Sequence, residues 1–234
     1  ELVKLMPGQS GPLDWLAEQT PKGATVAVDG AVLALASART LEAKLQERGC
    51  VLRTDIDVLN EVWQDRPALP VQPLYEHLPP QATVSRIEKL AQLREIIKQR
   101  NADAHFIATL DDIAWLFNLR GSDVSFNPVF VSFALISPTQ ASVFVDLNKV
   151  SATLRATLER DGVALRDYVE IGAALAALPA SARLLVDPAR VTCGLLNHLQ
   201  HDVTLVEGVN PTTLAKSQKS LDDAFHIRQA MEQD

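Results

Sequence analysis

Two histidines separated by two residues, His198 and His201, form one pattern in the chain that could do chemistry. At this spacing both imidazoles can lie on one face of a helix, where they could bind a metal ion. No cysteine, third histidine or glutamate completes a ligand set, and Asp202 would point in another direction. The sequence therefore favours a solvated pair at a helix end over a metal site.

Paired aspartates occur at positions 111–112 and 222–223. Adjacent residues on a helix face different directions, so neither pair predicts general acid–base catalysis. Carboxylates in the first turn of a helix complement its dipole, and we expect both pairs to have this role. Cys50 and Cys193 have no histidine at a diagnostic spacing and are expected to be buried small hydrophobes. Neither a glycine-rich nucleotide-binding motif nor a serine-nucleophile motif occurs.

The densest run of chemically capable side chains includes Asn118, Arg120, Asp123 and Asn127. Gly121 permits a tight turn after a helix. Such a turn would place the guanidinium of Arg120 and the carboxylate of Asp123 at a rim where a peptide or a partner surface could dock. We expect these four side chains to form a substrate-cleft or interdomain loop.

A structural alternative exists for the same run. In that alternative, Arg120 and Asp123 pair locally and hold the loop, while Trp115, Leu116 and Phe117 lie in the core. Both interpretations stay open from the residues alone.

The elements that must position this run alternate between strands and helices, which predicts an α/β fold with a helix-covered sheet. The clearest helix covers 85–100, because Ser85 and Glu88 form a capping box. Its apolar face is expected to contain Ile87, Leu90, Leu93, Ile96 and Ile97. Further helices are predicted at 13–18, 37–47, 111–117 and 151–161. Strands are predicted at 24–28, 50–52, 104–109, 184–186 and 203–206, with a hairpin formed by 129–136 and 141–145.

Five prolines between positions 66 and 80 predict a linker, since proline fixes φ and lacks an N–H. An internal repeat relates the two sides of this linker. Pro21 precedes a strand that ends at Asp29, and Pro179 precedes a strand that ends at Asp187 with the same spacing. We interpret this as a duplicated domain whose first copy lacks its opening half.

The composition limits the class of protein. The 234 residues are 47% hydrophobic and 22% charged, which excludes an intrinsically disordered chain. A net charge of −7 argues against binding to a nucleic-acid backbone, and no apolar run is long enough for a membrane span. Two cysteines fit a reducing cytosol. The chain opens with Glu1, so we expect it to be a piece of a longer protein.

Residues 110–123, Leu-Asp-Asp-Ile-Ala-Trp-Leu-Phe-Asn-Leu-Arg-Gly-Ser-Asp, are followed by Asn-Pro-Val-Phe at 127–130. This block resembles the second-domain signature of the long, three-domain Xaa-Pro aminopeptidases of the aminopeptidase P type. Asn-Glu-Val-Trp at 60–63 resembles the family's exit from its first domain. Asn210-Pro211, with Lys216 and Lys219, resembles the run that leads into the catalytic domain.

The resemblance implies a mixed β-sheet flanked by helices, of the creatinase/prolidase N-terminal-domain type, in two tandem copies with the first incomplete. Residues 1–76 would be the C-terminal half of the first copy with its proline-rich linker. Residues 81–216 would be the second copy, and 217–234 would begin the lead-in to a missing catalytic domain.

The resemblance also implies a cytoplasmic metallopeptidase that removes N-terminal residues preceding proline. Its catalytic domain would bind two divalent metal ions, usually manganese, so we expect no catalytic residue, metal or other cofactor in this chain. The implied partners are its own catalytic domain, peptides with proline at the second position, and a second copy in a homodimer of the full enzyme. Nucleic acids and membranes are not expected partners.

Two other interpretations stay open. The chain could be a stand-alone creatinase-like binding or assembly module, because a fold alone does not determine a function. It could also be a region of a prolidase or creatinase. A second front domain that contains the block from Trp115 to Gly121 disfavours this last interpretation, because those relatives have only one such domain.

Overall fold

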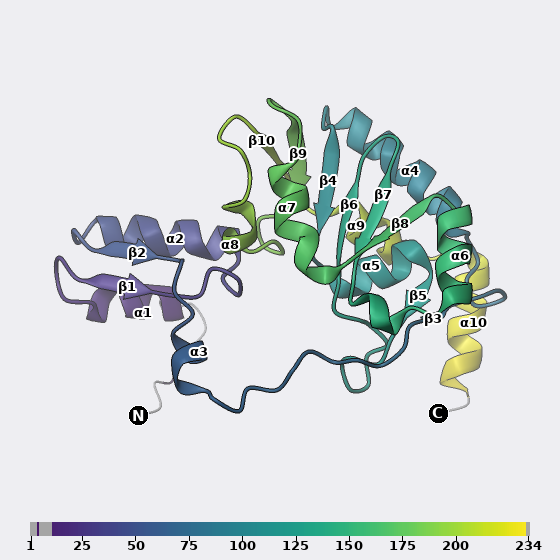
Figure 1. Cartoon of the computed structure of the whole chain (residues 1–234), viewed down its shortest axis with the longest axis horizontal. Helices are drawn as coiled ribbons and strands as arrows, with labels where there is room; N and C mark the ends of the chain where they lie inside the picture. Colours follow the sequence, from purple (N-terminus) through teal and green to yellow (C-terminus); the bar gives the residue numbers. More distant parts are fainter. Residues whose placement is uncertain (1–3, 5–10, 233–234) are drawn as a thin grey trace. The chain divides into compact units, whose positions relative to one another are not determined.

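The computed structural model describes residue 4 and residues 11–232. The chain divides into two compact units (Figure 1). The first contains residues 1–67 and 188–198, and the second contains residues 68–187 and 199–234.

The first unit is built around two short parallel strands, β1 (Thr25–Ala27) and β2 (Val51–Arg53). Helix α2 (Leu35–Gln46) connects them, and α1 (Pro12–Gln19) packs against α2. A short helix, α3 (Val58–Val62), follows β2. The core of this unit consists of Ala17, Leu41, Leu45 and Cys50. Cys50 is therefore a buried, free thiol, as the sequence predicted.

Residues 188–198, which include α8 (Cys193–Leu196), belong to this first unit rather than to the rest of 81–216. Backbone hydrogen bonds hold them there: Leu35 donates to the Val191 carbonyl at 2.9 Å, and Gly194 donates to the Gly30 carbonyl at 2.8 Å. A Cβ at Gly194 would lie 2.6 Å from the Gly30 carbonyl carbon, so this approach requires glycine. The sequence predicted the strands on either side of this segment, but it did not indicate that the segment packs in the first unit.

The second unit contains a six-stranded sheet in the order β10-β9-β4-β6-β7-β8. Its pairs β10–β9, β9–β4 and β7–β8 are parallel, whereas β4–β6 and β6–β7 are antiparallel. The expected mixed sheet and the hairpin across 137–140 are thus confirmed. The strands are β4 (Ala104–Ile107), β6 (Phe133–Ile136), β7 (Ala141–Phe144), β8 (Val163–Arg166), β9 (Arg183–Val186) and β10 (Thr204–Glu207).

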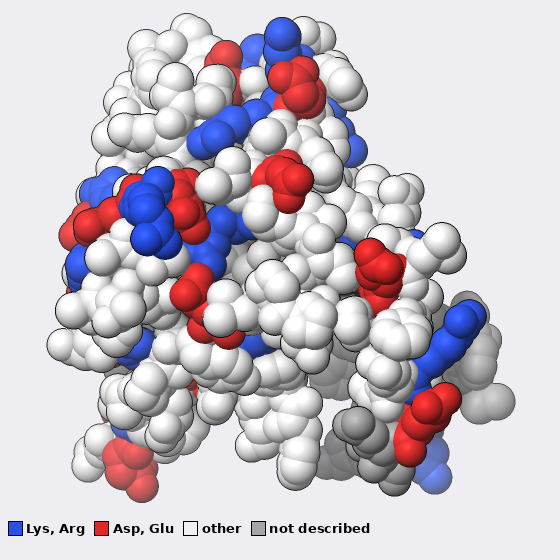
Figure 2. Space-filling view, turned by 90° about the vertical axis from the view of Figure 1, so that its right-hand side faces the viewer, with Lys and Arg blue, Asp and Glu red and all other residues white. Residues whose placement is uncertain are grey.

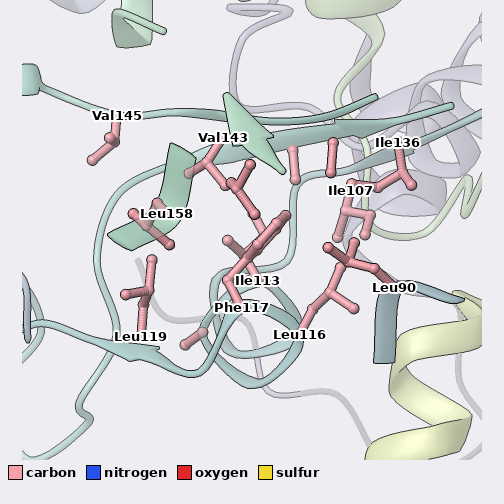
Figure 3. Packing of buried hydrophobic residues seen from close by; sticks show 14 of the residues in the cluster. Leu90, Ile107, Ile113, Leu116, Phe117, Leu119, Ile136, Val143, Val145 and Leu158 are labelled. Carbon is pink, nitrogen blue, oxygen red and sulfur yellow. The ribbon is translucent and has the colours of Figure 1, made fainter. Parts of the chain in front are cut away.

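Helices flank this sheet, and the largest core cluster lies between them and the strands. Figure 3 shows Ile113, Leu116 and Phe117 of α5 packed toward Ile136 and Val143 of the sheet. Burial of this α5 face is complete, since all three side chains are 0% exposed. The helices of this unit are α4 (Arg86–Gln99), α5 (Leu110–Phe117), α6 (Ala152–Arg160), α7 (Ile171–Ala176), α9 (Pro211–Ser217) and α10 (Leu221–Met231).

Helix α4 begins with the predicted capping box. The Ser85 hydroxyl accepts from the Glu88 N–H at 3.2 Å, and the Glu88 carboxylate accepts from the Ser85 N–H at 3.0 Å. The predicted apolar face is only partly correct, because Ile87 is 55% exposed. Arg86 and Lys89 are buried in the same two turns. These two charged side chains meet polar partners rather than the apolar core, since Arg86 pairs with Glu76 and Lys89 donates to Asn118.

The proline-rich linker is mostly irregular, as predicted, but it ends in a short strand. β3 (Tyr75–Glu76) pairs antiparallel with β5 (Leu119–Arg120), which directly follows α5. Each unit contains a pair of parallel strands, β1–β2 in the first and β9–β10 in the second, and a helix lies between the two strands in sequence, α2 and α8 respectively. The proposed duplication itself stays a prediction.

The charged side chains are mixed on the face shown in Figure 2, which is the side of α6 and α10 in Figure 1. Lysine and arginine side chains alternate there with aspartate and glutamate, and uncharged surface separates them. Across residue 4 and residues 11–232, no helix combines the length and the apolar character that a bilayer crossing needs.

Candidate functional site

The predicted loop begins at the C-terminal end of α5, and Asn118 is the residue that caps this end of the helix. Asn118 adopts the left-handed conformation, with φ 52° and ψ 44°. Asparagine tolerates this region better than most residues because its short side chain can hydrogen-bond locally. The Asn118 carbonyl accepts a hydrogen bond from the backbone N–H of His77 at 2.8 Å. The chain then enters β5, where Arg120 is paired with Tyr75.

Gly121 does not form the turn that the sequence suggested, because Asn118 has already made it. Gly121 is required for a different reason. A Cβ at this position would lie 2.8 Å from the Cβ of Phe130 and 3.1 Å from the Val129 carbonyl oxygen. Glycine therefore allows the two arms of the loop to approach each other.

The Asn118 side chain positions a buried lysine from another helix. Its Oδ1 accepts from Lys89 Nζ at 2.6 Å, and its Nδ2 donates to the Val84 carbonyl at 2.9 Å. Lys89 Nζ also donates to the Trp115 carbonyl at 2.8 Å and lies 4.4 Å from the centroid of the Trp115 ring. A cation at this distance from an aromatic ring is attracted by the ring quadrupole.

Lys89 carries its charge in a poorly hydrated environment. The residue is 7% exposed, and no ion pair between described residues includes it. Burial, together with the nearby Arg120 guanidinium, lowers the pKa of Lys89 to about 8. This lysine therefore changes its charge close to physiological pH.

Arg120 is held in place by the backbone. One of its guanidinium nitrogens donates to the carbonyls of Ala114 and Leu119, both at 2.9 Å. Burial lowers the pKa of Arg120, although the group stays protonated at neutral pH. The ion pairs between described residues do not include Arg120 either. Its remaining donors are thus available for a partner.

Lys89, Trp115, Asn118 and Arg120 are among the residues that line a cavity of about 470 Å³. The cavity is formed by residues of the second unit alone, from the β3–α4 segment, α4, α5, β5, α9 and α10. Its lining also includes Lys219, Asp223 and His226, which come from the first half of α10 and the residues that precede it. Six elements or segments that are far apart in sequence therefore meet at this site.

Charge is unevenly neutralised around this cavity. Lys216 pairs with Asp111 and, at 2.9 Å, with Asp112. Asp223 caps α10, and its carboxylate accepts from the Ser220 N–H at 2.9 Å and from the Thr83 hydroxyl at 2.8 Å. Although burial acts in the opposite direction, these hydrogen bonds hold the pKa of Asp223 below its ordinary value.

His77, at the same cavity, has a lowered pKa. The main cause is burial, and the positive charges of Arg120 and Lys89 add to it. His77 is therefore neutral at physiological pH. The cations at the cavity that form no ion pair with another described residue are Lys89, Arg120 and Lys219, and an anionic group would complement them.

Only two of the four predicted site residues lie at this cavity, Asn118 and Arg120. The carboxylate of Asp123 is buried, pairs with Lys149 and accepts from the Val131 N–H at 2.7 Å. The structural alternative, in which Arg120 and Asp123 pair locally, is therefore wrong on this point. Asn127 lies in an exposed turn, where its N–H donates to the Val124 carbonyl at 3.2 Å.

Sequence reasoning missed Lys89, Lys219 and Asp223 as site residues. A signal for Lys89 was present, because Arg86, Lys89 and Leu93 share one face of α4 at i, i+3 and i+7. Trp115 was assigned to the core, but it is partly exposed and lines the cavity. The paired aspartates do lie in the first turns of α5 and α10, as predicted.

Within residue 4 and residues 11–232, no group of three or more histidine, cysteine, aspartate or glutamate side chains is arranged to hold a metal ion. His198 and His201 both follow the end of α8 rather than share a helix face. The residues described here therefore do not fit the two metal ions that the resemblance implies.

The chain matches a known protein family over most of its length. The family described as the creatinase/prolidase N-terminal domain matches residues 65–222. This chain belongs to that family. The match contains the whole signature block at 110–130 and every residue lining the cavity except four on α10, which are Asp223, His226, Ile227 and Ala230. The predicted family resemblance is thereby confirmed.

Two relatives of this creatinase/prolidase-type chain are named probable Xaa-Pro aminopeptidase P. The protein of Arthroderma gypseum is 40% identical over 170 residues, which cover 72% of this chain and 27% of that protein. The protein of Botryotinia fuckeliana is 32% identical over 230 residues, which cover 92% of this chain and 35% of that protein. The chain thus spans about a third of the length of these relatives.

A solved structure with the same fold is an X-prolyl aminopeptidase from Caenorhabditis elegans, described as a cytosolic enzyme with a di-nuclear active site. The TM-score is 0.87 at 22% sequence identity, and the match covers 97% of this chain and 38% of that one. At this level of identity the likeness establishes the fold of the creatinase/prolidase-type chain.

Proposed function

We propose that this chain is a non-catalytic N-terminal portion of a cytoplasmic, metal-dependent Xaa-Pro aminopeptidase. The observation that carries the proposal is the family match to an N-terminal domain, together with relatives named Xaa-Pro aminopeptidase P that are about three times longer. The two metal ions, which we take to be manganese, find no ligand set among the described residues. In this proposal they belong to the catalytic domain.

The proposed role of the chain follows from the substrate. A peptide bond before proline has a nitrogen without hydrogen, and proline restricts the backbone on either side. An enzyme for such bonds gains selectivity if walls around its cleft admit only a free N-terminus. The segment from Asn118 to Asn127 is our candidate for part of this wall. Arg120 suits the role because two backbone carbonyls fix its guanidinium while it still faces open space.

The longer enzyme tests this role. Peptides of the form Xaa-Pro, Xaa-Pro-Ala and Xaa-Pro-Ala-Ala-Ala would be assayed with Arg120→Ala and with the exposed control Arg160→Ala. We expect Arg120→Ala to lower kcat/KM by about tenfold, corresponding to about 1.4 kcal/mol, for at least one peptide length. An unchanged kcat/KM at every length would contradict the proposed wall.

The 234-residue chain on its own provides a second test. Incubated with Mn²⁺ and an Xaa-Pro peptide, it should release no N-terminal residue. Robust metal-dependent turnover would show that the chain is catalytic by itself. Assembly with its own catalytic domain, binding of peptides with proline at the second position, and a homodimer of the full enzyme are further parts of the proposal.

A stand-alone binding or assembly module is the second candidate function. It is favoured by one observation, which is that the cavity beside Lys89 is formed by this chain without any other domain. The reading frame of the gene distinguishes the two candidates. A frame that continues into a metal-binding domain supports the aminopeptidase, and a frame that stops supports the module.

A further inference from the structure

Two cations at the cavity, the buried Lys89 and the half-buried Arg120, have no carboxylate ion-pair partner among the described residues. Lys89 donates to an amide oxygen and a backbone carbonyl, and Arg120 donates to two backbone carbonyls. Neutral acceptors compensate a buried charge less well than an anion does. An anion between these two side chains would therefore gain charge-assisted hydrogen bonds without displacing an existing ion pair.

The other charges around the cavity do not supply that anion. Asp111 and Asp112 are occupied by Lys216, and the carboxylate of Asp223 is occupied by Ser220 and Thr83. Lys219 stands at the exposed rim and adds a further positive charge. The carboxylate of Asp223 lowers the net positive charge of the cavity. A ligand with one negative charge is therefore favoured over a ligand with two.

The size and lining of the cavity indicate the rest of the ligand. A volume of about 470 Å³ falls in the range that small organic ligands occupy in proteins. Apolar side chains lie beside the cations, and the largest of them is the Trp115 ring. The apolar lining consists of Ala82, Val84, Trp115, Ala215, Ile227 and Ala230. A ligand that fits both features has an apolar body and one anionic group.

We propose that this cavity binds a small organic carboxylate, with its carboxylate between Lys89 and Arg120 and its apolar body against Trp115. The site lies in a single unit of the chain and needs neither a metal nor the catalytic domain. It goes beyond the proposed peptidase role, because binding here is measurable in the 234-residue chain without turnover.

The first experiment compares probes that share shape and differ in charge. The chain is titrated with sodium benzoate, neutral benzamide and sodium phosphate at pH 7 and constant ionic strength, and the indole N–H signal of Trp115 is followed by NMR. Trp115→Phe assigns that signal. We expect a saturable shift with benzoate and no saturable shift with benzamide. Phosphate should bind at least about tenfold more weakly than benzoate. Equal binding of benzamide, or tighter binding of phosphate, would overturn the proposal.

The second experiment removes the charge and keeps the length of the side chain. Lys89→Met should weaken benzoate binding by about tenfold or more, because a charge-assisted hydrogen bond is lost. Lys98→Met removes an exposed lysine from the same helix and should leave binding unchanged. If Lys89→Met does not fold, as judged by circular dichroism, Lys219→Met at the rim replaces it, with an expected loss of about threefold. Unchanged binding in the folded variant overturns the assignment.

Discussion

The carboxylate of Asp123 forms an ion pair with the ammonium of Lys149, and the two side chains are 0% and 1% exposed. The same carboxylate accepts from the Val131 N–H, and the Lys149 carbonyl accepts from the Leu74 N–H at 2.9 Å. This buried pair therefore joins the signature loop to the end of the linker and to the turn after β7. It explains how a loop that carries an exposed Phe126 at its tip keeps a fixed base.

Breaking this pair should destabilise the fold strongly. In Lys149→Met the Asp123 carboxylate stays buried without its counter-charge, and such losses cost about 3–5 kcal/mol. Urea unfolding at pH 7 measures the free energy of unfolding directly. A change smaller than about 1 kcal/mol would contradict the buried pair.

Two further variants serve as controls for Lys149→Met. Replacing both partners, Asp123→Leu with Lys149→Met, leaves no unpaired charge and should recover most of the lost stability. Lys98→Met removes an exposed lysine and should change stability by less than about 0.5 kcal/mol.

Features that depend on neighbouring residues could be predicted from the sequence. The capping box of α4 needs only Ser85 and Glu88, and the β6–β7 hairpin needs only four turn residues between two apolar runs. The short strand β8 was not predicted, and of helix α10 only the start at the paired aspartates was. β8 has four residues directly after Gly162, and exposed apolar residues such as Leu221 and Phe225 weaken the periodicity of α10.

The site could be predicted only in part, because it is assembled from distant elements. Asn118 and Arg120 lie in the recognisable block, whereas Lys89 and Asp223 reach the cavity from α4 and α10. The sequence likewise did not indicate that Asp123 pairs with Lys149, because the short spacing between Arg120 and Asp123 suggested a local pair instead. Long-range pairing of charges has no periodic signature in a single sequence.

The buried Lys89 should make the stability of the fold vary with pH in the alkaline range. Its pKa is about 8 in the folded chain and 10.5 in the unfolded one, so the unfolded state binds more protons between these values. Stability therefore rises with pH across this window, by roughly 3 kcal/mol if the shift is fully expressed. Urea unfolding at pH 7.5, 9 and 10 measures the rise, and Lys89→Met should lack it.

The charges that face Lys89 set the size of this effect. Arg86 on the same helix, Arg120 on β5 and Lys219 before α10 lower its pKa, whereas Asp223 on α10 raises it. Asp223→Asn should therefore lower the pKa of Lys89 further and move the alkaline rise to lower pH. A rise at the same pH in this variant would mean that Asp223 does not face the lysine.

His105 on β4 should make the fold sensitive to acid. The side chain is 0% exposed, and complete burial lowers its pKa to about 4 from 6.5. Its Nδ1–H donates to the Leu185 carbonyl at 2.9 Å, which fixes the tautomer of the neutral ring. Because the unfolded state gains a proton first, stability falls as pH drops from about 6.5 to 4, by roughly 3 kcal/mol.

An NMR titration of the folded chain tests the cause of this acid sensitivity. The ring protons of His105 should keep the chemical shifts of a neutral imidazole down to about pH 5. In His105→Leu the fall in stability between pH 6.5 and 4 should be smaller, although the hydrogen bond to Leu185 is lost, at a cost of about 1 kcal/mol. Titration of the ring near pH 6.5 in the folded chain would contradict its burial.

Asn118 combines a backbone role with a side-chain role, and two substitutions separate them. Asn118→Gly keeps the left-handed backbone but removes the acceptor for Lys89 and the donor to Val84, so we expect a loss of about 1–3 kcal/mol. Asn118→Ala removes the same hydrogen bonds and adds the strain of a Cβ at φ 52°, about 1 kcal/mol more. Urea unfolding of both variants gives the difference. Equal stability of the two variants would contradict the left-handed conformation of Asn118 at the end of α5.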